Sequence, residues 1–214
     1  MDMRVTKFEH ATLTIVDMGR TLIIDPGSFT APLGELEDVV AIVLTHEHAD
    51  HWTADHLDRI LGMFPGTPIF APEGVSKAAA AYDITVVHPG DVVEVDPFRL
   101  EFFGGRHALI HESIPVVDNV GVLVNDDFYY PGDSYAVPEG RSVKLLAAPV
   151  GAPWLKIGEA MDFVLAVAPR RVFATHDMTL SVSGRDMGRA RLGWAAEQNG
   201  GELVVLNPGD ATES

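Results

Sequence analysis

The chain has 214 residues, of which 47% are hydrophobic and 21% are charged, with a formal net charge of −16 at pH 7. This composition excludes an intrinsically disordered chain, and the length can bury a sizeable core in a single domain over residues 1–214. The acidic surface repels a phosphate backbone, so nucleic acid is not expected as a partner.

The absence of cysteine excludes disulfides, thiolate zinc sites and a cysteine nucleophile, and it is typical of a reducing compartment. No apolar run reaches the roughly 18–20 residues that cross a bilayer. The N-terminal segment MDMRVTKFEH also lacks the basic and apolar stretches of a secretion signal. We therefore expect a cytoplasmic protein without a membrane partner.

Strands dominate the predicted first half of the chain. Apolar runs bounded by turn residues predict strands over 4–8, 11–16, 20–24, 39–44 and 67–71. Helical spacing predicts one helix over 53–63, with Thr53 as its N-cap, and an Ala-rich helix over 74–82.

The second half repeats the pattern of strands followed by helices. Strands are predicted over 84–88, 92–95, 99–103, 120–124, 128–130, 171–174 and 202–206, and helices over 156–168 and 184–199. This order predicts an α+β protein with two sheets packed on each other and helices outside, a four-layer αββα sandwich. The hairpins are too numerous for a doubly wound parallel sheet.

The segment THEHADHW at 45–52 directly follows the apolar strand 39–44. Because side chains two apart in an extended segment point the same way, His46 and His48 can bind one metal ion together. Asp50 and His51 lie where the chain turns and can face a second ion. The alternative is a solvated polar loop, which is the weaker interpretation because ligand types, spacing and placement at a strand end all agree.

Four ligands do not fill two coordination spheres, so further donors are expected at other strand ends. His107 follows the predicted strand 99–103, Asp133 follows 128–130, and His176 follows 171–174. Ligands just beyond the ends of rigid strands are a typical way of holding a metal.

These motifs resemble the metallo-β-lactamase superfamily over essentially the whole chain. The resemblance rests on HEHADH at 46–51, His107, Gly132-Asp133 and His176, in the order found in that family. His10, Asp25-Pro26 and the turn at 131–134 look most like the branch around ascorbate-6-phosphate lactonase. The resemblance implies the metallo-β-lactamase fold, and this branch often assembles into homo-oligomers.

The resemblance also implies the ligands of two divalent ions. It puts His46, His48 and His107 on one ion and Asp50, His51 and His176 on the other, with Asp133 bridging them. Nitrogen and oxygen ligands suit Zn²⁺ best, with Mn²⁺ or Fe²⁺ as alternatives.

The implied function is a binuclear hydrolase of a small ester, lactone or phosphoester. A hydroxide shared by the ions would attack the substrate, and Asp50 or a metal-bound water would handle the proton. The catalytic residues would be Asp50 and Asp133. A different class stays open, namely a metal-binding or sensor protein of the same fold without catalysis.

Several positions leave alternatives open. His111 competes with His107 as a ligand if residues 106–110 are helical, although His107 follows its strand more closely. Pro-Gly-Asp also occurs at 89–91 and 208–210, where it predicts turns. His10 and Asp25 either hold ligand imidazoles by hydrogen bonds or are polar residues at strand ends.

The remaining candidates concern the surface and the substrate pocket. His56 and His88 are predicted to be surface residues. The residues that could line the pocket are Trp52, Arg106, Ser134, Tyr135 and Trp154. Arg106 or Lys156 could bind an anionic group of the substrate.

Overall fold

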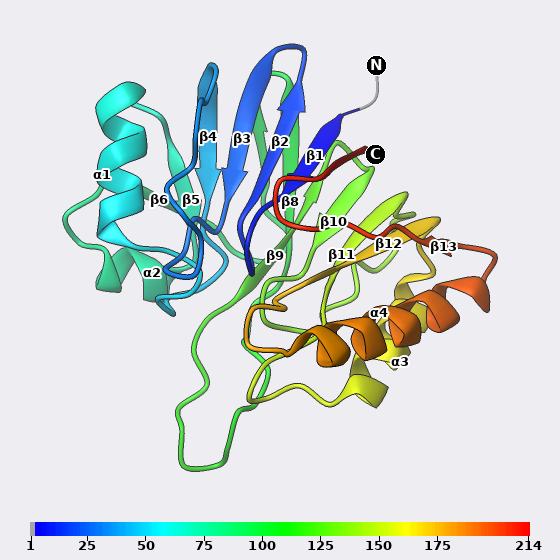
Figure 1. Cartoon of the computed structure of the whole chain (residues 1–214). Helices are drawn as coiled ribbons and strands as arrows, with labels where there is room; N and C mark the ends of the chain where they lie inside the picture. The colour runs from blue at the N-terminus through cyan, green and yellow to red at the C-terminus, as the bar shows by residue number, and fades with distance from the viewer. Residues whose placement is uncertain (1–2) are drawn as a thin grey trace.

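The computed structural model describes residues 3–214, and its strands form two seven-stranded sheets (Figure 1). The strands of the first sheet are β1 (Arg4–Lys7), β2 (Leu13–Asp17), β3 (Arg20–Ile24), β4 (Val39–Val43), β5 (Ile69–Ala71), β6 (Ile84–Val86) and β14 (Ala211–Glu213). They lie in the order β14-β1-β2-β3-β4-β5-β6. The strand near the C-terminus therefore pairs with the first strand of the chain.

The second sheet repeats this plan in the rest of the chain. Its strands are β7 (Val92–Val95), β8 (Phe98–Gly104), β9 (Val120–Val124), β10 (Phe128–Tyr130), β11 (Leu145–Pro149), β12 (Arg171–Thr175) and β13 (Glu202–Leu203). They lie in the order β13-β12-β11-β10-β9-β8-β7. In each sheet one half is antiparallel and the other half is parallel.

The strand directions bring the functional segments to one edge of each sheet. In the first sheet β1, β3 and β4 run in the same direction, because β2 is antiparallel to both β1 and β3. In the second sheet β8, β10, β11 and β12 share a direction for the same reason. The segments that follow these strands therefore leave each sheet at a common edge.

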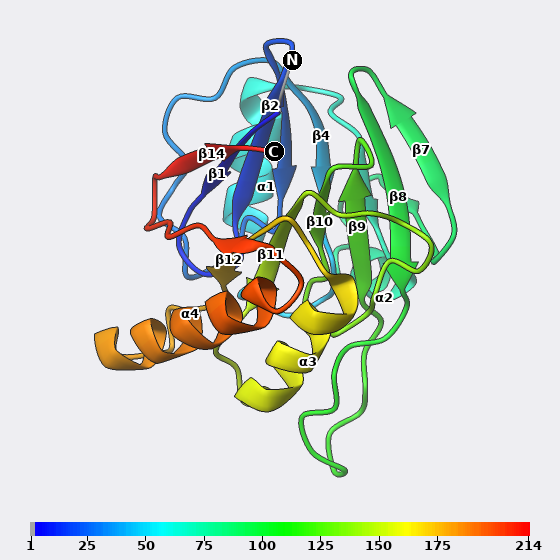
Figure 2. The ribbon, with the colours of Figure 1, turned by 90° about the vertical axis from the view of Figure 1, so that its right-hand side faces the viewer.

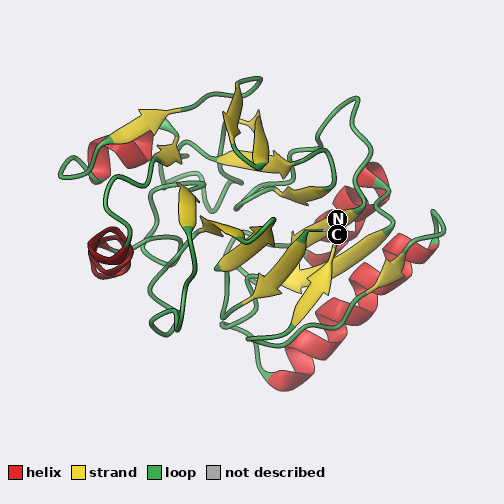
Figure 3. Cartoon of the chain, turned by 90° about the horizontal axis from the view of Figure 1, so that it is seen from above, coloured by secondary structure: helices red, strands yellow, loops and turns green. Residues whose placement is uncertain are grey.

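Helices cover the outer faces of the two sheets (Figures 1, 2 and 3). The four helices are α1 (Ala54–Met63), α2 (Glu73–Ala78), α3 (Ile157–Val167) and α4 (Val182–Glu197). Leu57 of α1 and Val75 of α2 belong to a cluster with Ile42 of the first sheet. Val164 of α3 and Leu192 of α4 belong to a cluster with the second sheet. The αββα sandwich expected from the order of elements is confirmed.

The central core lies between the sheets, where β2 and β3 face β8, β9 and β12. Because these sheets are covered on both sides, their middle strands are apolar on both faces. Leu22 and Ile24 of β3 point into the central core, whereas Ile23 between them packs on the side of α1. Leu146 of β11 likewise faces α3, and its neighbour Leu145 faces the central core. None of the helices in residues 3–214 is long and apolar enough to cross a bilayer.

Two strands were not predicted, and one helix is shorter than predicted. The run that forms β11 contains two alanines and a proline, which are poor strand formers. β14 is short and polar, and it exists because it pairs with β1 at the sheet edge. The helix expected over 74–82 ends at Ala78, and Tyr82 turns back so that its hydroxyl donates to Asp58 of α1.

His56 was predicted to be a surface residue, and this prediction is wrong. Its side chain is buried, and Nε2 lies 3.2 Å from the carbonyl oxygen of Thr30. The loop after β3 passes over this face of α1 and covers the imidazole. His88 is exposed as predicted, and the Pro-Gly-Asp segments that end at Asp91 and Asp210 form turns.

Candidate metal centre

Three histidines from both sheets form the first group of the centre. His46 and His48 follow β4 of the first sheet, and His107 follows β8 of the second. One ligand atom from each lies within 4.8 Å of the others. His46 Nε2 and His48 Nδ1 are 3.0 Å apart, and the ring centroid of His107 lies 4.9 Å from that of His46. The histidines that were expected on one ion therefore lie together.

A second group forms around Asp50, which lies in the turn after β4. His176, directly after β12, places Nε2 3.4 Å from Asp50 Oδ2. His10, which follows β1, places its own Nε2 3.1 Å from the same oxygen. His51 Nε2 is 3.9 Å from this oxygen. Four strand ends thus contribute to the two groups, although they lie far apart in the chain.

Asp133 lies between the two groups, as the resemblance implies for a bridging carboxylate. Its Oδ1 is 3.2 Å from His51 Nε2. Its Oδ2 is 3.1 Å from His176 Nε2 and 3.4 Å from His107 Nε2. The side chain is 4% exposed, so these contacts are made away from bulk water. The structure therefore brings all seven expected ligands together, and their binding of metal stays a prediction.

The donor atoms at the centre fit divalent cations. Four buried polar atoms of the centre form no hydrogen bond to any residue among 3–214: Nε2 of His51, His107 and His176, and Oδ1 of Asp133. Buried polar groups are rarely left without a partner unless water or an ion serves them. Imidazole nitrogen and carboxylate oxygen are donors that suit Zn²⁺, Mn²⁺ and Fe²⁺.

A buried carboxylate fixes the orientation of His51. Asp25 follows β3, and its Oδ2 lies 2.6 Å from His51 Nδ1. The same carboxylate accepts hydrogen bonds from the backbone N–H and the hydroxyl of Thr45, at 2.8 and 2.7 Å. A proton held on Nδ1 leaves Nε2 of His51 free to bind a cation. Of the two alternatives for Asp25, the structure shows the one that holds a ligand imidazole.

Backbone carbonyls fix the other two inward-facing imidazoles. Nδ1 of His107 lies 2.5 Å from the carbonyl oxygen of Ala108. Nδ1 of His176 lies 2.5 Å from the carbonyl oxygen of Gly151, in the loop after β11. Each nitrogen donates to its carbonyl, so Nε2 is the atom that points into the centre.

His10 holds Asp50 in place. His10 is completely buried, and its Nδ1 accepts a hydrogen bond from the backbone N–H of Met178, at 3.4 Å. The proton of the neutral ring is therefore on Nε2, which donates to Asp50 Oδ2. Burial lowers the pKa of His10 and favours this neutral form. His10 thus orients the carboxylate of Asp50, whereas the role expected for it was to hold a ligand imidazole.

The charges of the centre shift the pKa values of its histidines in opposite directions. Burial, reinforced by His51, holds the pKa of His46 well below its usual value. Burial also acts to lower the pKa of His51, but the charges of Asp133 and Asp25 outweigh it and raise that pKa well above its usual value. Asp133 likewise outweighs burial at His176 and raises its pKa to about 9. Both raised histidines therefore carry protons that a cation must displace.

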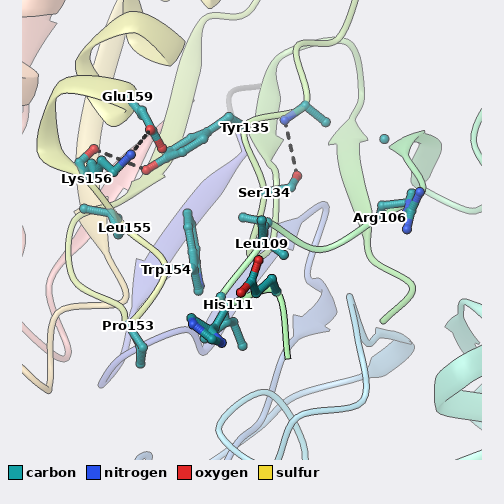
Figure 4. A pocket seen from close by; sticks show the side chains of 15 residues that line it. Arg106, Leu109, His111, Ser134, Tyr135, Pro153, Trp154, Leu155, Lys156 and Glu159 are labelled. Carbon is teal, nitrogen blue, oxygen red and sulfur yellow. Dashed lines mark hydrogen bonds and ion pairs between the residues drawn. The ribbon is translucent and has the colours of Figure 1, made fainter. Parts of the chain in front are cut away.

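A pocket of about 990 Å³ opens beside the centre (Figure 4). Trp154 stands along its wall, next to Tyr135, and the indole N–H donates to Asp133 Oδ2 at 2.9 Å. The wall also includes Arg106 and Ser134. Trp154 therefore links the wall of the pocket to Asp133, which does not itself line the pocket.

Two expected positions lie elsewhere. Trp52 does not line the pocket, because its indole N–H donates to the carbonyl oxygen of Glu47 and its ring packs on the α1 side of the first sheet. His111 lines the pocket but belongs to none of the ligand groups found among residues 3–214. Residues 106–110 are not helical, so His111 does not share a face with His107. His107 is the histidine that lies in the centre.

Sequence reasoning missed the carbonyl groups of Ala108 and Gly151 and the hydroxyl of Thr45. Backbone carbonyls carry no signal of residue type. The loop that contains Gly151 could still have been found, because it follows the apolar run 145–150 as the ligand loops follow their strands.

Comparisons with known proteins agree with the fold. A family model described as the beta-lactamase superfamily domain matches residues 4–176. Protein Rv0786c of Mycobacterium tuberculosis is 34% identical over 197 residues, which cover 89% of this chain and 91% of that protein.

Two solved structures share the fold at low sequence identity. Igni18, a metallo hydrolase from the archaeon Ignicoccus hospitalis, has a TM-score of 0.76 and 18% identity over 100% of this chain and 99% of that one. YhfI of Bacillus subtilis, a metallo-beta-lactamase fold protein, has a TM-score of 0.75 and 17% identity over 100% of both chains. From the matched family domain, the similar relative and the shared fold, we conclude that the chain belongs to the metallo-β-lactamase superfamily.

Proposed function

We propose that the protein is a hydrolase that uses two divalent cations to cleave a small ester, lactone or phosphoester. One observation carries the proposal: Asp133 contacts His51, His107 and His176, which come from both ligand groups, and the same carboxylate contacts Trp154 in the wall of a large pocket. A purely structural metal site would not need an open pocket at its carboxylate. The net charge of −16 supports a small-molecule substrate rather than a nucleic acid.

The side chains of the centre have distinct roles in this proposal. The cations are held by His46, His48 and His107 on one side, by Asp50, His51 and His176 on the other, and by Asp133 between them. When bound, they supply a water of lowered pKa and a Lewis acid for the oxygen of the substrate's reacting group. Asp50 is 26% exposed, against 4% for the side chain of Asp133, so it is the carboxylate that can exchange a proton with the substrate.

Zn²⁺ is the cation that the donor set favours. The centre offers five imidazoles and two carboxylates, and imidazole suits zinc and iron better than the harder manganese. Mn²⁺ and Fe²⁺ remain alternatives because both carboxylates are in place. Zinc-loaded protein is therefore expected to be at least as active as manganese-loaded protein on the same substrate.

The pocket favours a substrate with an apolar or ring-shaped body and an anionic group. Trp154 and Tyr135 offer aromatic faces. Lys156 is paired with Glu159 at 3.1 Å, whereas Arg106 forms no ion pair with any residue from 3 to 214. Arg106 is thus the cation that can bind a carboxylate or phosphate. A phosphorylated lactone, as in the lactonase-like branch that the sequence resembles, fits this description.

A panel of lactones, esters and phosphodiesters, assayed with zinc- and manganese-loaded protein, tests the proposal. Turnover should require the cations, disappear with a chelator and fall at least about 100-fold in the Asp133→Asn variant. The Asp126→Asn variant, on an exposed turn away from the centre, is the matched control. Two bound ions without turnover of any substrate would contradict the hydrolase and favour a metal-binding role.

The choice of substrate is tested at Arg106. The Arg106→Ala variant should raise KM for phosphorylated substrates about tenfold or more and leave KM for neutral esters unchanged. Equal KM values for phosphorylated substrates in the variant and the unaltered protein would contradict the role of this arginine.

A further inference from the structure

The indole of Trp154 lines the pocket (Figure 4), and its N–H reaches Asp133 of the metal centre. Its N–H donates to Asp133 Oδ2 at 2.9 Å, and the residue is only 7% exposed. Water does not compete well for so buried a donor, and a hydrogen bond to an ionised carboxylate is among the stronger ones in proteins. The contact is therefore a persistent feature of the site.

This hydrogen bond fixes how Asp133 presents its two oxygens. The last torsion of an aspartate side chain is broad, so a carboxylate without partners can turn about it. With Oδ2 held by Trp154, Oδ1 faces His51 at 3.2 Å and Oδ2 faces His176 at 3.1 Å. A rotation of the carboxylate plane would break both alignments. Trp154 thus selects the orientation that serves both ligand groups.

Packing holds the indole itself in place. A turn in which the Leu155 N–H donates to the carbonyl oxygen of Ala152 fixes the backbone around Trp154. The ring makes an edge-to-face contact with Tyr135 at 5.2 Å, and Tyr135 in turn packs against Phe163 of α3 at 5.8 Å. The indole therefore cannot swing away from Asp133 without disturbing this aromatic row.

The loop after β11 contacts the centre at a second point. The carbonyl of Gly151 accepts a hydrogen bond from His176 Nδ1, and Trp154 three residues later donates to Asp133. Both contacts act on ligands of the same cation pair. A short loop outside the ligand set thereby controls the orientation of two ligands.

We propose that Trp154 is a positioning residue of the metal centre, whose indole N–H holds the Asp133 carboxylate in the orientation that binds both cations. This inference rests on the cation pair of the proposed function. Its tests measure metal binding and the hydrogen bond rather than hydrolysis. Normal metal binding without turnover of any substrate would refute the proposed function and leave the role of Trp154 open to the same tests.

Zinc titration of chelator-treated protein by calorimetry is the first test. The Trp154→Phe variant keeps an aromatic ring but lacks the donor, and it should bind one of two zinc equivalents about 10-fold more weakly. The Tyr135→Phe variant loses a hydroxyl from the same aromatic row, keeps the donor, and should bind as the unaltered protein does. Equal affinities in the Trp154→Phe variant and the unaltered protein, or equal losses in both variants, would overturn the proposal.

NMR of the unaltered protein gives a second test that does not depend on the folding of a variant. The chain has three tryptophans, so ¹⁵N-labelled protein should show three indole N–H signals. The Trp154 signal should exchange slowly with water both before and after zinc is added, whereas that of Trp194, which is 47% exposed, should exchange fast. Fast exchange of the Trp154 signal in the zinc-loaded protein would show that the hydrogen bond does not hold Asp133 there, and would refute the role.

Discussion

Replacing Asp25 by asparagine tests how the protein sets the metal-binding nitrogen of His51. Asp25 is completely buried, and its φ of 49° lies in a region that asparagine also adopts with little strain. Oδ1 accepts the N–H of Thr45 at 2.8 Å, and Oδ2 accepts the Thr45 hydroxyl and His51 Nδ1. The substitution therefore keeps shape and backbone and changes only which atoms can accept.

The amide of the variant has only one possible orientation in this site. Its oxygen must stay against the N–H of Thr45, because the amide NH₂ group there would leave two donors facing each other. The NH₂ group then takes the place of Oδ2 and donates to His51 Nδ1. The proton of His51 moves to Nε2, the atom that faces Asp133, and a protonated nitrogen cannot bind a cation.

In the Asp25→Asn variant, one cation is therefore expected to lose His51 as a correctly oriented ligand. Removing such a partner typically costs about 10–100-fold in metal affinity, which is about 1.4–2.7 kcal/mol. Zinc titration against a competing chelator measures this loss of zinc affinity. The Asp126→Asn variant is the control, because Asp126 also has a positive φ of 56° but its side chain is 60% exposed. Zinc affinity within twofold of the unaltered protein in the Asp25→Asn variant would refute this account of the tautomer.

Three further predictions follow from the same geometry. Zinc binding at pH 7 should release protons from His51 and His176, because both pKa values are raised (to about 9 for His176), so the affinity should increase as pH rises towards 9. Calorimetry in buffers of different ionisation enthalpy counts these protons, and a count of zero would contradict the prediction. Metal analysis should find one zinc equivalent fewer in the His107→Ala variant than in the unaltered protein, whereas the His111→Ala variant should retain both equivalents. A lost zinc equivalent in the His111→Ala variant would instead make His111 a ligand. The Lys7→Met variant should lower the free energy of unfolding by about 3 kcal/mol in chemical denaturation, because buried Asp177 loses its hydrogen-bonded partner and keeps only the longer contact with Arg189 at 3.8 Å. A change below about 1 kcal/mol would argue against the Lys7–Asp177 pair.

The ligands could be predicted because each lies just after a segment that the sequence predicts to be a strand. Residues 39–43 form β4 as expected, and the HEHADH segment begins three residues after its end. His107, Asp133 and His176 follow β8, β10 and β12 in the same way. Residue type and position at a strand end are both visible in a sequence, and together they identified the seven side chains that the structure brings together.

The groups that orient the ligands could not be predicted in the same way. The carbonyls of Ala108 and Gly151 act through the backbone, which any residue could supply. The bond between Trp154 and Asp133 depends on β11, whose alanines and proline gave no clear strand pattern. The prediction for His56 failed for a different reason. Histidine is a polar residue type and was therefore expected at the surface, but this position of α1 is buried, as is that of Leu57.

The central claim is that the side chains of both sheets bind a pair of neighbouring cations, and anomalous diffraction from zinc-loaded crystals tests it most directly. The account predicts two zinc peaks per chain on either side of Asp133, each within about 2.0–2.2 Å of imidazole nitrogens and carboxylate oxygens. Crystals grown with excess zinc that show no anomalous peak between His46 and His176, or with the imidazoles turned apart, would contradict it.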